Sequence, residues 1–189
     1  MVRVAALVCA GMVLLAAGYL WVGRVYAVPS ASMQPLLEPG DRIAVSRLDR
    51  GDVRRGDVVV VDVRGTWATG ASNGAPTVVK RVIGLPGERV MCCDDDGRVV
   101  IDGVPLAEPY LSPAGAGTPF EVVVPSGRLW LLGDARRDSQ DSRHHLGAPG
   151  GGSVPVEAVQ GRVVAVLWPL SRLSTVERTP MTVRTVAGM

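Results

Sequence analysis

Two hydroxyl side chains close together are the first residues of this sequence whose types and spacing could do nucleophilic chemistry. Ser30 and Ser32 lie in the segment VPSASMQP at residues 28–35, between two prolines. Proline fixes its own φ and pushes the preceding residue toward extended conformations. A loop restrained in this way can hold a serine hydroxyl in one orientation, as a nucleophile requires. Because most serines are ordinary surface residues, the motif gains meaning only if the chain also supplies a base.

The candidate base is Lys80, the single lysine among 20 basic residues. It lies in the valine-rich segment TVVKRVIG at residues 77–84. Arginine stays protonated, with a pKa above about 12, whereas lysine loses its charge readily when it is buried. A lone lysine among valines is therefore a candidate for a neutral amine that acts as a general base. The alternative is an ordinary strand lysine whose stem packs while its ammonium reaches water.

A third polar segment, LLGDARRDSQDSR at residues 131–143, directly follows an apolar run. One interpretation is a solvated loop with local salt bridges. The other is that its hydroxyls and charges hold the base in place.

Together these segments resemble the bacterial type I signal peptidases, the membrane-bound Ser/Lys endopeptidases that remove secretory signal peptides. The similarity lies in SASMQP at 30–35, RGDVVV at 55–60, KRVIGLPG at 80–87, and GD through DSR at 133–143. These motifs come in the family's order and span most of the chain after residue 27. One motif alone would be weak, but four in order argue against a chance match.

The resemblance implies a mechanism. Ser32 Oγ would attack the scissile carbonyl of a preprotein, and neutral Lys80 would take its proton and later protonate the leaving amine. The backbone N–H of Ser32 and the hydroxyl of Ser30 would stabilise the oxyanion. The sequence also places valines and an isoleucine around Lys80. Burial of the lysine among these apolar residues would lower the pKa of its amine.

The resemblance also assigns supporting roles by position. Ser139 would hydrogen-bond the lysine, and Asp141 and Arg143 would form a structural ion pair behind it. No metal or cofactor is implied. The expected substrates are signal peptides with small side chains at −1 and −3, held in shallow apolar pockets lined by Val28, Pro29, Leu37 and Val79.

The third segment departs from the family pattern in three places. Ala135 and Asp138 stand where asparagine is usual, and Arg137 stands where an acidic residue is usual. The inverted charge at Arg137 could alter reaction rate or substrate preference without touching the Ser–Lys pair. Two alternatives therefore stay open: a Ser–Lys peptidase dedicated to a narrow precursor of the pilus or conjugation type, and a β-domain that binds peptides without cleaving them. The retained Ser32 and Lys80 argue against the second.

Residues 4–23 carry no charge. At about 1.5 Å per residue, such a helix would span about 30 Å, the thickness of the hydrocarbon core. Aromatic residues gather at its far end, where an aromatic belt would lie. Arg3 and the α-amine precede it and Arg24 follows it, and this charge asymmetry favours an N-terminus in the cytoplasm. The alternative is a cleaved signal peptide, whose apolar region is usually shorter, at about 7–15 residues.

We therefore predict a cytoplasmic N-terminus at residues 1–3, a transmembrane anchor at 4–23, and a single β-rich peptidase domain at 24–189. The domain would lie on the outer face of the plasma membrane, in contact with the lipid bilayer. The remainder of the chain predicts a mainly β fold, because its apolar runs are short, rich in β-branched residues and bounded by glycine and aspartate. The expected strands include 43–45, 58–63, 78–83, 98–101, 122–124, 129–132 and 163–167.

Other function classes find little support. The net charge of +2 is too small to suggest a nucleic-acid partner. Two adjacent pairs, Cys92–Cys93 and His144–His145, lack ordinary zinc-ligand spacing. The histidines directly follow the third segment and could suggest a Ser–His mechanism. Relatives that use histidine place it where this chain has Lys80, so the resemblance favours Ser–Lys.

Overall fold

The computed structural model describes residues 22–46, 52–67, 77–111, 118–179 and 181. The predicted anchor at 4–23 lies outside the described residues except for its last two positions. These two belong to strand β1 (Val22–Ala27), because the backbone from Val22 onward pairs with a neighbouring strand. None of the helices within the described ranges has the length and apolar character needed to cross a bilayer.

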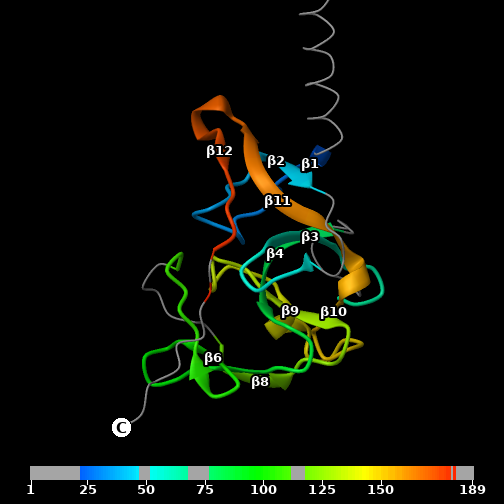
Figure 1. Cartoon of the computed structure of the whole chain (residues 1–189), viewed down its shortest axis with the longest axis vertical. Helices are drawn as coiled ribbons and strands as arrows, with labels where there is room; N and C mark the ends of the chain where they lie inside the picture. The colour runs from blue at the N-terminus through cyan, green and yellow to red at the C-terminus, as the bar shows by residue number, and fades with distance from the viewer. Residues whose placement is uncertain (1–21, 47–51, 68–76, 112–117, 180, 182–189) are drawn as a thin grey trace, which may run out of the picture.

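The described chain forms two antiparallel sheets, with the larger one above the smaller one in Figure 1. The larger sheet has the order β1, β2, β11, β3, β4, β9, β10, with β12 beside β11. The smaller sheet has the order β7, β6, β5, β8. The strands after β1 are β2 (Arg42–Ser46), β3 (Val58–Asp62), β4 (Thr77–Gly84), β5 (Arg89–Cys92), β6 (Val99–Ile101), β7 (Val104–Pro105), β8 (Phe120–Val123), β9 (Arg128–Leu132), β10 (Val154–Pro155), β11 (Val159–Trp168) and β12 (Ser174–Thr175).

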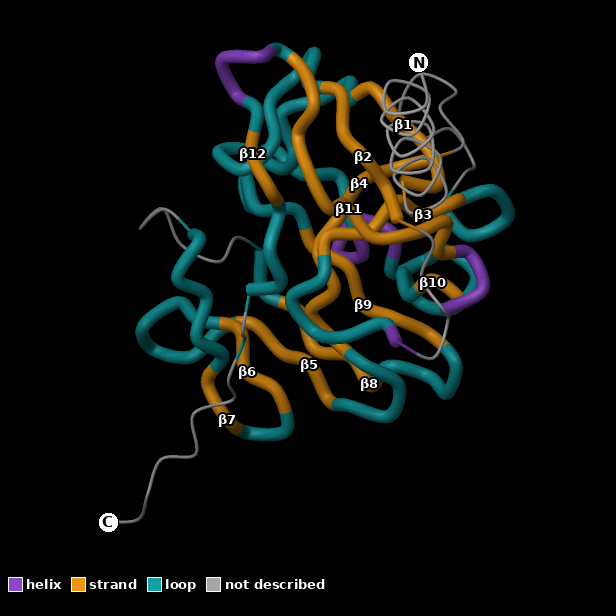
Figure 2. The backbone as a smooth tube through the Cα atoms, turned by 45° about the horizontal axis from the view of Figure 1, so that its top comes forward, coloured by secondary structure: helices purple, strands orange, loops and turns teal. Residues whose placement is uncertain are grey.

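Helical structure in the described residues is limited to short 3-10 turns at connections, as Figure 2 shows. Three of them lie wholly within the described residues: η3 (Ser142–His145), η4 (Val156–Ala158) and η5 (Leu170–Arg172). The mainly β prediction is confirmed, and each of the seven expected strands has a counterpart in β2, β3, β4, β6, β8, β9 or β11.

The centre of the larger sheet positions the chemistry. Strand β3 is an unbroken valine run whose first four residues are all buried, as expected for a strand covered on both faces. It pairs in register with β4, so that Val59 lies opposite Lys80. Strand β11 pairs with both β2 and β3, and both pairings contain register shifts of the kind that bend a strand and increase its twist.

The two sheets meet where β4 ends, at Gly84. A Cβ atom there would lie 2.6 Å from Val90 Cγ2, 2.9 Å from Trp130 Cβ and 2.9 Å from Val124 Cγ2. These neighbours belong to a core cluster between the smaller sheet and β9, which includes Phe120 and the fully buried Trp130. Cys92 packs in this cluster and is joined to Cys93 by a disulfide.

This close packing generates a stability prediction. Gly84→Ala should reduce the free energy of unfolding by about 1–3 kcal/mol, because overpacking a filled core forces its neighbours to shift. Gly147→Ala is the matched control, since nothing lies within 4 Å of a Cβ built there. Denaturant unfolding of both variants checks the prediction, and an equal, small effect at the two positions would contradict it.

Candidate active site

A cavity of about 480 Å³ opens beside β1, the segment after it, and β4. It gathers residues that are far apart in the sequence, including Ser32 and Lys80. Its described lining is mostly apolar and comprises Tyr26, Ala27, Val28, Pro29, Ser30, Ser32, Met33, Val60, Thr77, Val78, Val79, Lys80, Asp138 and Gln140.

Ser32 lies in a turn that is fixed on both sides. The N–H of Gln34 donates to Ala31 O at 3.0 Å, and Val28 and Met33 on either side of Ser32 are buried in a core cluster with Val45 and Val60. Ser32 as a whole residue is 7% exposed. The turn therefore presents Ser32 at the cavity wall while its neighbours anchor the backbone.

Lys80 approaches Ser32 from the middle of β4. Its Nζ lies 2.7 Å from Ser32 Oγ and 3.1 Å from Val79 O. An ammonium at this position donates to Oγ, whereas a free amine accepts the hydroxyl proton. The side chain is only 3% exposed, so the alternative of a strand lysine whose ammonium reaches water does not fit.

Burial lowers the pKa of Lys80 to about 8, against the opposing influence of Asp141 and Asp134, which favour the charged amine. Desolvation therefore outweighs two carboxylates. A pKa of about 8 leaves roughly a tenth of the amine neutral at pH 7, compared with well under 1% for an ordinary lysine. The environment thus leaves part of this amine uncharged near neutral pH.

Ser30 also contacts the Ser32 hydroxyl. Its Oγ donates to Ser32 Oγ at 3.3 Å. Because Ser30 is exposed and lines the cavity, its hydroxyl can turn toward a bound carbonyl oxygen as that oxygen gains charge.

The third polar segment packs directly against the Ser32 turn. The N–H of Ala135 donates to Ser32 O at 3.1 Å. A Cβ at Gly133 would lie 2.4 Å from Ser32 O and 2.2 Å from Ser139 Oγ. Glycine at 133 therefore permits the close approach of this segment to the serine backbone.

Asp141 and Arg143 form a buried ion pair within this segment, with Arg143 Nη2 2.7 Å from Asp141 Oδ2. Asp141 Oδ2 also accepts from Gly133 N–H at 3.0 Å. Burial alone would raise the pKa of Asp141, but Arg143 and the Gly133 N–H hold it below its ordinary value. The carboxylate thus stays charged and ties the segment together.

Ser139 occupies a different arrangement from the predicted one. Its Oγ is buried beside Gly133, and its hydroxyl helps to lower the pKa of the Asp141 carboxyl rather than bonding the Lys80 amine. The bond predicted from Ser139 to Lys80 is therefore not formed in this structure.

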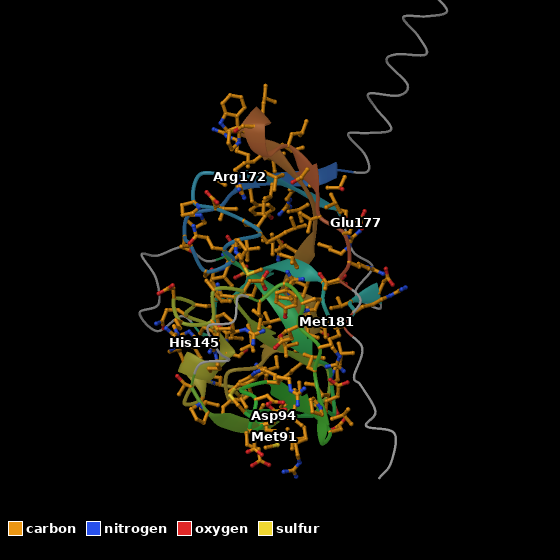
Figure 3. The ribbon with its side chains drawn as sticks, turned by 90° about the vertical axis from the view of Figure 1, so that its left-hand side faces the viewer. Met91, Asp94, His145, Arg172, Glu177 and Met181 are labelled. Atoms are coloured by element: carbon orange, nitrogen blue, oxygen red, sulfur yellow. A yellow bond between two sulfur atoms is a disulfide. The ribbon has the colours of Figure 1, made fainter. Side chains whose placement is uncertain are left out.

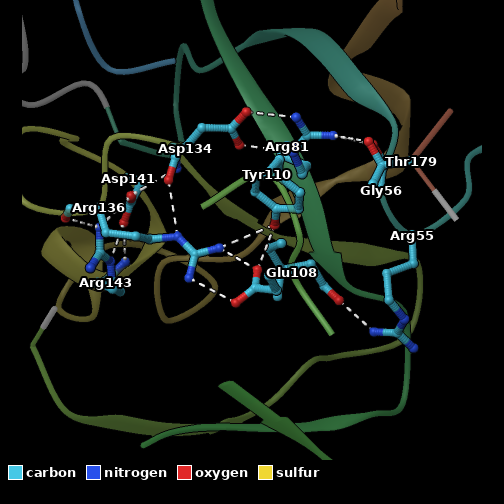
Figure 4. Close-up of polar contacts among 12 residues, drawn as sticks. Arg55, Gly56, Arg81, Glu108, Tyr110, Asp134, Arg136, Asp141, Arg143 and Thr179 are labelled. Carbon is cyan, nitrogen blue, oxygen red and sulfur yellow. Dashed lines mark hydrogen bonds and ion pairs between the residues drawn. The ribbon is translucent and has the colours of Figure 1, made fainter. Parts of the chain in front are cut away.

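Arg81, the neighbour of Lys80, points into a separate buried ion pair. Arg81 donates to Asp134 through Nε at 2.8 Å and Nη2 at 2.6 Å, and to Gly56 O at 2.8 Å (Figure 4). Successive residues of a strand face opposite sides of the sheet. Lys80 and Arg81 therefore leave the strand on opposite faces, Lys80 toward Ser32 and Arg81 toward Asp134.

A second buried network was missed by sequence reasoning. Arg136 donates to Gly133 O at 3.0 Å and forms an ion pair with Glu108, while the Arg81 guanidinium lies 3.9 Å from the centre of the Tyr110 ring (Figure 4). Burial raises the pKa of the Tyr110 phenol well above its usual value. Glu108 and Tyr110 follow the smaller sheet and carry no local motif, so nothing in the sequence pointed to them.

One sequence prediction needs correction. Leu37 is fully buried in the core cluster behind the Ser32 turn and does not line the cavity, whereas Val28, Pro29 and Val79 do.

The two histidines do not line the cavity that holds Ser32 and Lys80. His145 stacks on Trp67 with ring centroids 4.9 Å apart, and His144 faces Asp141, so neither contacts Ser32. Figure 3 shows His145 away from the upper end of the molecule.

Comparisons with known proteins agree with this geometry. A family model described as signal peptidase, peptidase S26, matches residues 1–168. The probable signal peptidase I of Mycobacterium leprae is 34% identical over 205 residues, covering 80% of this chain and 71% of that protein. The signal peptidase I of Bacillus caldolyticus is 34% identical over 171 residues, covering 82% of this chain and 85% of that protein. This chain belongs to the peptidase S26 family of signal peptidases.

The family predicted from the four motifs is thereby confirmed, and with it the class of serine peptidase. A crystal structure of a signal peptidase I from Enterococcus faecalis also resembles this S26 peptidase, at 28% identity and a TM-score of 0.47. That similarity covers 62% of this chain and 98% of the other. The assignment rests on the sequence matches.

The lowered pKa of Lys80 in this S26 peptidase carries a stability cost. Below pH 8 the folded state must hold a buried ammonium, whereas between pH 8 and about 10.4 the folded amine is neutral and the unfolded one is still charged. The unfolded state then binds more protons, so stability rises with pH across that window.

Lys80→Met should therefore raise the free energy of unfolding at pH 7 by about 1–3 kcal/mol, because a similar volume is kept without a buried charge. The gain should shrink as pH rises from 8 to 10. Urea unfolding at pH 7 and pH 10 measures both effects. A destabilised variant, or a gain that does not depend on pH, would show that burial does not disfavour the charged form of Lys80.

Proposed function

We propose that this chain is a membrane-anchored serine endopeptidase that removes N-terminal signal peptides from exported preproteins by a Ser32–Lys80 dyad. The observation that carries the proposal is the 2.7 Å contact between Ser32 Oγ and the buried Lys80 Nζ at the wall of an open cavity. A hydroxyl and an amine of lowered pKa at this distance are a nucleophile and its general base.

The proposed reaction proceeds by acyl transfer. Neutral Lys80 takes the hydroxyl proton as Ser32 Oγ attacks the scissile carbonyl carbon, and the new oxyanion accepts from the Ser32 N–H and the Ser30 hydroxyl. The Lys80 ammonium then gives its proton to the leaving amine, and the acyl-enzyme remains. Lys80 next takes a proton from water as the water oxygen attacks the ester carbon. The C–O bond to Ser32 then breaks, and the Lys80 ammonium returns the proton to Ser32 Oγ.

The cavity supports selection of an extended substrate with small side chains at −1 and −3. Val28, Pro29 and Val79 form apolar walls close to the nucleophile. Strand β1 ends at this cavity and is an edge of the larger sheet, with β2 as its only described neighbour. An extended peptide can therefore add to the sheet edge by main-chain hydrogen bonds while its side chains enter the pockets.

The relatives are named signal peptidase I, a membrane-associated family, and exposed apolar residues support the same location here. The turn between β11 and β12 exposes Trp168, Leu170 and Leu173 by 53%, 69% and 61%. This turn projects from the upper end of the molecule, where β1 and β2 also lie (Figure 1). Apolar side chains clustered at one end suit contact with a bilayer in which the predicted anchor is embedded.

Cleavage of a preprotein with an Ala-X-Ala site in detergent tests the dyad. Wild-type activity should rise about tenfold per pH unit below pH 8 and level off above it, because the neutral amine is the active form. Ser32→Ala and Lys80→Arg should each abolish cleavage, and mass spectrometry should locate the cut after the second alanine. Activity that survives in Lys80→Arg would rule out the dyad.

Fluorescence quenching by brominated lipids tests the membrane contact. The full chain reconstituted in bilayers should lose a measurable part of its quenching in Trp168→Phe, because the exposed indole reaches the lipid. Trp67→Phe is the matched control, since Trp67 is 3% exposed and donates to Gly152 O within the fold. Equal quenching in Trp168→Phe and wild type would place the turn outside the bilayer.

A further inference from the structure

The cavity that holds the Ser–Lys pair has one acidic residue on its wall. Asp138 and Gln140 both line it and are both exposed. Asp138 is the sole carboxylate among the described residues that line the cavity. A backbone hydrogen bond fixes the turn that carries Asp138, since the Asp138 N–H donates to Ala135 O at 2.9 Å.

The negative charge of Asp138 is not neutralised by a partner. The neighbouring buried carboxylates each have an arginine: Asp134 pairs with Arg81, Asp141 with Arg143, and Glu108 with Arg136. Asp138, in contrast, makes no side-chain hydrogen bond or ion pair with any residue in the described ranges. Its charge therefore remains available to a molecule that enters the cavity.

The adjacent cation does not share this position. Arg137 is exposed, as Asp138 is, but it does not line the cavity. Lys80 is the one other charged group among the described lining residues, and burial keeps it partly neutral near pH 8. A peptide in the cavity thus meets an unpaired carboxylate at a wall that is otherwise mostly apolar.

We infer that Asp138 is a specificity determinant, which favours peptides carrying lysine or arginine close to the scissile bond and disfavours those carrying glutamate or aspartate there. The inference rests on the proposed function, because it concerns the substrate of the same site. The physical basis is Coulomb attraction beside low-dielectric walls, partly screened by solvent.

The test measures kcat/KM for peptides that share an Ala-X-Ala site and differ only in one residue, lysine or glutamine, placed in turn at each position flanking the site. At one position or more, wild type should prefer lysine by about two- to fivefold at low salt, the range of an exposed ion pair. Asp138→Asn should abolish that preference, and Gln140→Glu should increase it. The preference should also fade near 1 M salt, where the Debye length is about 3 Å.

Asp95→Asn is the matched control, because Asp95 is exposed in the turn between β5 and β6 and does not line the cavity. It should leave the lysine preference unchanged. Peptides that are cleaved with equal lysine preference by wild type and Asp138→Asn would overturn the inference while leaving the proposed function intact. No cleavage of any peptide by folded wild type would instead count against the proposed function on which the inference rests.

Discussion

The desolvation of one amine is the constraint on which the site depends. Lys80 Nζ is held 2.7 Å from Ser32 Oγ, and burial lowers its pKa to about 8. Water at this position would restore the charge, and a charged lysine cannot accept a proton. The valines of β3 and β4 and the cluster under the Ser32 turn keep the lysine stem dry. The core thus does more than stabilise the fold, because it determines the basicity of the amine.

A dry site tolerates charges only when they are paired, and this explains the arrangement of ions around Lys80. Asp141 and Asp134 both favour the ammonium, and each is bound by an arginine. An unpaired carboxylate at either position would pull the pKa of Lys80 upward and carry a desolvation penalty of its own. Pairing therefore stabilises the segment at 133–143 and limits the electrostatic effect of the two carboxylates on Lys80. Asp138 can stay unpaired because it is exposed.

The sequence predicted those parts of the candidate site whose signal lies within a short stretch of residues. The serine motif, the single lysine and the β-branched runs are readable because neighbouring residues create their signal. The network of Glu108, Tyr110 and Arg136 is not readable in this way, because it joins segments far apart in the chain. Leu37 shows the same limit: its motif position suggested a pocket wall, but the turn after Ser32 directs it into the core. Strand β1 was not predicted, because the predicted anchor at 4–23 includes its first two residues.

The use of lysine at position 80 and arginine at 81 follows from the pleat of β4. The two side chains leave the strand on opposite faces, one toward the Ser32 cavity and one toward Asp134. The second position needs a permanent cation with a planar set of donors, since Arg81 binds both oxygens of Asp134 and also Gly56 O. Position 80 needs a side chain that can lose its charge when it is buried. Lysine does so, whereas arginine stays protonated. Exchanging the two residues would therefore remove the base and the bidentate ion pair together, although the net charge of the strand would not change.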